Sequence, residues 1–184
     1  IHDNSLCQDT HLPPYSPIPP VHFEPDIQAI LAASRGVIAQ LLTEQNASPS
    51  WNGMVLALDE LGARLSRAWS PVSHLNAVCN SAELRAAYEA CLPKLSEYWT
   101  ELGQNRGLFE AYQALASGPA AAGFDVAQKT ILEHALRDFR LSGIDLPPAG
   151  QQRYGAIQMK LSELTSSFSN QLLDATQAWS KHIT

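Results

Sequence analysis

The residues best spaced for chemistry in this sequence surround His134. Glu133, His134 and Asp138 lie in one predicted helix, and the four-residue step from His134 to Asp138 places both on one helix face. Imidazole and carboxylate groups are common zinc ligands, but two of them without a third do not make a zinc site. We therefore expect a solvated or salt-bridged helix face here, and metal binding by these three residues remains a weaker hypothesis.

Other catalytic patterns are missing from the sequence. None of the six histidines stands four residues from another, so there is no His-Glu-x-x-His zinc helix. The G-x-S-x-G nucleophile motif and both glycine-rich phosphate loops are also absent. Ser166, Ser167 and Ser169 have no base nearby in the sequence, and adjacent carboxylates such as Asp59 and Glu60 point to different sides of a helix. The sequence therefore predicts no catalytic, cofactor-binding or metal-binding residue in this chain.

The cysteines favour a reducing compartment. The sequence has an odd number of cysteines, Cys7, Cys79 and Cys91, and no two of them are spaced as C-x-x-C. We therefore expect no disulfide framework and a cytoplasmic location. Cys79 and Cys91 lie on apolar helix faces and are expected to be buried core residues.

Composition excludes several partners. A chain of 184 residues can form one domain with a real core. The net charge is -6 and the 12 basic residues form no run, which argues against nucleic-acid binding and against an anionic membrane surface. No apolar run approaches the length of a membrane-spanning helix.

Periodicity predicts an all-α fold, an antiparallel bundle of about six to seven helices. Residues 1–24 are proline-rich and are expected to form an extended strap, and residues 25–184 the helical domain. Apolar residues interleaved with the prolines are expected to anchor the strap: Leu12, Tyr15, Ile18, Val21 and Phe23.

Local signals predict where the helices begin and end. Pro25 should start the first helix, and Pro71 should kink or break a later one. Gly143 should adopt the left-handed conformation after a helix. The expected N-terminal caps are Ser48 followed by Pro49, Asn80 paired with Glu83, and Asp125 paired with Gln128.

The last segment, from about residue 148 to 181, predicts a helix roughly 50 Å long. Its apolar residues recur at steps of three and four, which forms one stripe that other helices should cover. No C-cap signal follows Trp179, so we expect the natural chain to continue. The stripe consists of Tyr154, Ile157, Leu161, Leu164, Phe168, Leu172, Ala175 and Trp179.

Three long strings resemble the N-terminal region of the thimet-oligopeptidase-like zinc metallopeptidases. They are LPPYSPIPPVHFEPDI at 12–27, RAWSPVSHLNAVCNSAELRAAYEACLPKLSEYWTELGQN at 67–105, and LRDFRLSGIDLPP followed by KLSELTSSFSNQLLDATQAW within 136–179. Their order and spacing match over essentially the entire chain.

The resemblance implies a helical lobe that forms one wall of a substrate channel and admits only short, unstructured peptides. Zinc, held by a His-Glu-x-x-His helix and a further glutamate, would lie in a C-terminal catalytic lobe of the longer enzyme. This chain has no such motif, so no zinc or catalytic residue carries over to it and we expect it to be inactive alone. Surface that packs on the catalytic lobe would be exposed, which predicts possible self-association.

A different hypothesis is a stand-alone helical scaffold that holds a partner helix on the stripe from Tyr154 to Trp179. The coding sequence beyond Thr184 distinguishes the two, because a downstream His-Glu-x-x-His favours the peptidase and a stop codon favours the scaffold.

Overall fold

A computed structural model describes residues 6, 18–45, 48–79 and 81–181. Six α-helices and no strand occur among these residues, so the predicted all-α class is confirmed. The helices are α1 (Phe23–Glu44), α2 (Ala57–Val78), α3 (Ala82–Gly103), α4 (Arg106–Ser117), α5 (Val126–Leu141) and α6 (Pro148–Ala178). Shorter helical segments are η2 (Pro20–His22), η3 (Trp51–Leu56) and η4 (Pro119–Gly123).

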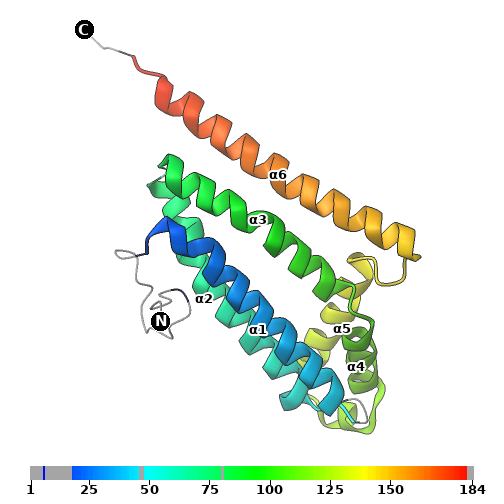
Figure 1. Ribbon diagram of the computed structural model, residues 1–184. Coiled ribbons are helices and arrows are strands. Elements are labelled where there is room, and N and C mark those ends of the chain that lie inside the picture. The colour runs from blue at the N-terminus through cyan, green and yellow to red at the C-terminus, as the bar shows by residue number, and fades with distance from the viewer. Residues whose placement is uncertain (1–5, 7–17, 46–47, 80, 182–184) are drawn as a thin grey trace.

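Helix α3 lies at the centre of the arrangement. It packs against α1, α2 and α6, while α4 and α5 pack together at one end. Successive long helices run in alternating directions, so that α6 returns antiparallel along α3 (Figure 1). This position makes α6 an outer helix with one side against the body.

The core consists of residues from α1 through α5 and the segments that join them, together with Leu6 and Ile18 ahead of α1. Its fully buried side chains include Phe23, Ile27, Met54, Leu65 and Leu108. Helix α4 turns four apolar residues inward, and all four are buried: Leu108, Phe109, Tyr112 and Leu115. By contrast, α6 contributes no buried residue.

Only the end of the predicted strap, residues 18–24, lies in a continuous described segment, and it becomes helical from Pro20 onward. A 3₁₀ turn, η2, leads directly into α1, which begins at Phe23 and not at Pro25. Ile18 and Phe23 are buried as predicted, but Val21 is 73% exposed and anchors nothing. Leu12 and Tyr15 lie outside the described residues.

The N-cap residues of η3 and α3 differ from the predicted ones. Ser50, not Ser48, accepts a hydrogen bond from the Gly53 N–H at the start of the π-helical segment η3. Ser81 caps α3, and Asn80, the predicted cap, lies outside the described residues. In both cases the serine hydroxyl accepts a hydrogen bond from the backbone amide three residues later in the chain.

Pro71 does not break its helix. Helix α2 continues through it to Val78, and the proline ring is fully buried. A proline removes only one backbone donor, and tertiary packing offsets that loss.

Local signals succeed at both ends of α5. Asp125 and Gln128 form the predicted capping box. Gly143 has φ of +87°, the left-handed conformation predicted from its position after the helix.

No helix in the described part of the chain is both long and apolar enough to cross a membrane.

Candidate interaction face of the terminal helix

Helix α6 presents two different faces. Its polar face, defined here as Gln158, Ser162, Ser166 and Asn170, is partly buried toward the body. The five central residues of the predicted stripe, called the apolar stripe from here on, are Ile157, Leu161, Leu164, Phe168 and Leu172, and they are 53 to 68% exposed. The expectation that other helices cover the stripe is therefore wrong for these five residues, whereas Tyr154 is half-buried.

The start of α6 is fixed by a dense corner. Ile144, in the connection from α5, is fully buried. The Gln104 side chain donates to the Ser142 carbonyl at 3.0 Å, and the Gln151 side chain donates to the Ile144 carbonyl at 3.1 Å. The Arg106 guanidinium donates to the same Ile144 carbonyl. These contacts set the direction in which α6 leaves the body.

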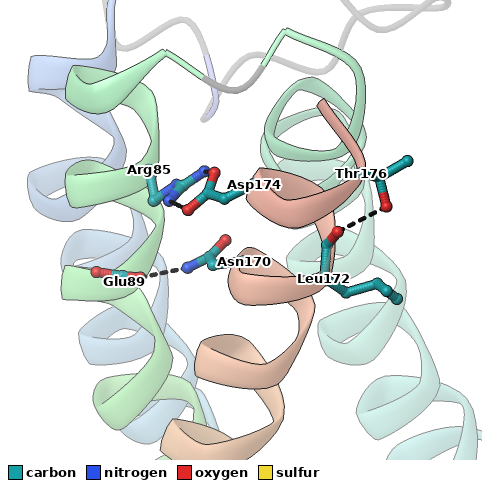
Figure 2. Close-up of polar contacts among 6 residues, drawn as sticks. All are labelled: Arg85, Glu89, Asn170, Leu172, Asp174 and Thr176. Carbon is teal, nitrogen blue, oxygen red and sulfur yellow. Dashed lines mark hydrogen bonds and ion pairs between the residues drawn. The ribbon is translucent and has the colours of Figure 1, made fainter. Parts of the chain in front are cut away.

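The far half of α6 is held by charge and not by apolar packing. The Arg85 guanidinium on α3 donates to both carboxylate oxygens of Asp174, at 2.9 and 2.7 Å. One turn away, the Asn170 amide donates to the Glu89 carboxylate at 2.7 Å (Figure 2). The Arg85 hydrogen bond lowers the pKa of Asp174, so the carboxylate stays ionised to a lower pH than a free aspartate does. We call these four residues the latch.

Two grooves separate α6 from its neighbours. The first groove, of about 920 Å³, lies between α2, α3 and α6, and its lining includes Trp69, Tyr88 and Trp99 together with serine and threonine residues of α6. The second groove, of about 810 Å³, lies between α3 and α6 beside the latch. Open grooves therefore flank the contact between α3 and α6 on both sides of the polar face.

The residues considered for metal binding are not brought together. The Asp138 carboxylate pairs with Arg137 at 2.8 Å. No cluster of three or more His, Cys, Asp or Glu side chains occurs in the described part of the chain. Glu133, His134 and Asp138 therefore do not fit a zinc site, and no catalytic step is assigned to them.

The two described cysteines differ in environment. Cys91 is buried, and burial raises the pKa of its thiol to about 11, so it is a packing residue without thiolate reactivity. Cys79 is exposed at the end of α2, so its predicted burial is wrong.

Sequence reasoning missed the latch. Arg85 and Asp174 are 89 residues apart, and no local pattern pairs them. A signal did exist for the polar face, because its four residues recur every four positions along α6.

Comparison with known proteins shows to which family this chain belongs. Residues 27–152 match the family model described as the neurolysin/thimet oligopeptidase N-terminal domain. The chain belongs to the neurolysin/thimet oligopeptidase family. The match covers most of the chain and ends in the first turns of α6.

Bacterial members of the neurolysin/thimet oligopeptidase family align over nearly the whole chain. It is 49% identical to oligopeptidase A of Haemophilus influenzae over 180 residues, and 46% identical to oligopeptidase A of Escherichia coli over 181 residues. A probable cytosolic oligopeptidase A of Arabidopsis thaliana is 32% identical over 181 residues. Each alignment covers 98% of this chain but only 26% of the relative, so the chain spans about a quarter of their length.

Proposed function

We propose that this chain is the N-terminal helical domain of a zinc-dependent oligopeptidase that hydrolyses short peptides in the cytoplasm. The observation that carries the proposal is 46 to 49% identity to three bacterial proteins named oligopeptidase A, across 98% of the chain. Zinc and the catalytic residues belong to the remainder of the longer enzyme. The chain is inactive without that remainder.

Within that enzyme, the chain forms one wall of the substrate channel and excludes folded proteins. The match of residues 27–152 to the N-terminal domain of the family supports this role.

A domain exchange tests the function. In Haemophilus influenzae oligopeptidase A, the matching N-terminal region is replaced by this chain, and hydrolysis of a quenched short peptide is measured with and without a zinc chelator. We expect chelator-sensitive hydrolysis of the peptide and no cleavage of a folded protein. The isolated chain, assayed with added zinc, serves as the inactive control.

Two outcomes contradict the proposal. A folded but inactive exchange protein would show that this chain cannot serve as the N-terminal domain of the peptidase. Chelator-sensitive turnover by the isolated chain would show that the chain carries its own active site.

A stand-alone scaffold is the second candidate function, and the exposed apolar stripe is the observation that favours it. On this alternative the partner helix belongs to a different protein. Sequencing of the coding region beyond Thr184 separates the two, because only the peptidase requires a downstream His-Glu-x-x-His motif.

A further inference from the structure

The apolar stripe of α6 has the composition of a buried surface. All five of its residues are more than half exposed, with Phe168 at 68%. No charged residue occurs in α6 between Glu163 and Asp174, so ten consecutive positions lack the charges typical of a solvated helix. Contiguous exposed apolar surface of this kind marks an interaction site.

The stripe also adjoins a space that this chain does not fill. Leu161 belongs to the stripe and lines the first groove, whose opposite wall includes the half-exposed Trp99. The polar face of α6 is already used against α3, so the stripe is available for a different element. One apolar element could cover the stripe and the groove together.

The comparisons point to the occupant. The match to the N-terminal domain of the family ends at residue 152, just before the stripe begins. The alignments with oligopeptidase A, which cover 98% of the chain, extend over the stripe. The stripe therefore lies beyond the residues that match the N-terminal domain, but inside a sequence shared with proteins about four times as long.

We propose that the apolar stripe of α6 packs against the downstream part of the same oligopeptidase, on an apolar surface poor in charge that also covers Leu161 and Trp99. Helix α6 then joins the two parts of the enzyme, with its polar face on α3 and its stripe on the catalytic part. The inference rests on the proposed function and specifies the surface through which the two parts meet.

The test compares one double substitution in two contexts, the isolated 184-residue chain and the exchange protein with the rest of Haemophilus influenzae oligopeptidase A. Leu164→Ser with Phe168→Ser should leave the thermal midpoint of the isolated chain unchanged, because both side chains are already exposed there. The same pair should lower the midpoint of the exchange protein by more than about 3 °C, because both side chains are buried in it. Amide hydrogen exchange at 157–172 should be slower in the exchange protein.

Two controls accompany the test. Val126→Ser removes an exposed apolar side chain on α5, 83% exposed, and should change neither midpoint. Leu164→Met with Phe168→Leu keeps the stripe apolar and should retain most of the stability of the exchange protein.

Equal, small falls in the thermal midpoint of the isolated chain and of the exchange protein would overturn the inference, because the stripe would then be exposed in the longer protein as well. The inference would also be overturned if the isolated chain formed a dimer that the serine pair dissociates while the stripe stayed exposed in the exchange protein. The stripe would then bind a second copy of the chain. Peptide hydrolysis by the unsubstituted exchange protein is read separately, and only that readout decides the proposed function.

Discussion

Asp26 is a charged residue inside the core. It is 1% exposed, and its Oδ2 atom has no hydrogen-bond partner among the described residues. Burial raises the pKa of its carboxyl group, while a hydrogen bond from the Leu6 amide and the nearby charge of His22 oppose that rise. A buried carboxylate with incomplete partners is costly when ionised.

The Asp26→Asn variant should be less sensitive to pH than the wild type. Because the pKa is raised in the folded state, the protonated carboxyl stabilises the fold below about pH 4, and this contribution is lost as pH rises through the raised pKa. Urea unfolding at pH 4, 5.5 and 7 should show a smaller fall in the free energy of unfolding for the variant. Parallel pH profiles for the two proteins would contradict this account.

The capping box of α5 provides a second prediction at the residue scale. The Asp125 carboxylate accepts from the Gln128 amide at 2.8 Å, and the Gln128 side chain accepts from the Asp125 amide at 3.1 Å. Asp125→Ala should reduce the free energy of unfolding by about 1 kcal/mol. Asp125→Ser, which keeps an acceptor, should recover most of that loss in the same urea titration, and equal losses for both variants would count against the cap.

The latch between α3 and α6 holds the second half of α6 against the body. The corner at Ile144 fixes the start of α6, but two open grooves flank its middle. Arg85 and Asp174 therefore hold α6 far from its fixed end, so losing their contact should let the second half of the helix move away from α3. Both side chains are at the surface, so salt screens their attraction.

Asp174→Asn should loosen the second half of α6 without unfolding the body. The measurement is amide hydrogen exchange, which should become faster at residues 166–178 and remain unchanged in α1 and α4. Because the pKa of Asp174 is lowered, the wild-type latch should persist above about pH 4 and weaken as pH falls further. Glu163→Gln is the matched control, since its partner Lys160 lies on the same helix. An equal effect of both substitutions would contradict the latch.

A feature of an element could be predicted from the sequence when its causes lie within a few residues of it. Asp125 and Gly143 were predictable because their conformations depend on residues within one turn of them. Pro71 was not, because packing against other helices keeps α2 continuous. Periodicity correctly placed the stripe of α6 on one face, but it does not reveal what covers that face.

For the whole molecule, the distribution of buried residues separates α6 from the rest. Among the described residues, every buried side chain lies between Leu6 and Ile144. Helix α6 adds polar contacts, the latch and partial cover for α3, but no core residue. Burial of apolar side chains is the dominant stabilising term of a fold, so the body should not depend on α6 for its stability.

A chain shortened to residues 1–152 should therefore fold. It ends where the match to the family model ends and keeps Gln151, whose side chain binds the Ile144 carbonyl. Far-UV circular dichroism should show the loss of the α6 helix alone, and urea unfolding should remain cooperative. For comparison, Leu132→Ala in the full chain removes a side chain that is 2% exposed, which should cost about 2–5 kcal/mol. If deletion of residues 153–184 destabilises the chain more than Leu132→Ala does, α6 contributes to the stability of the body and this account is wrong.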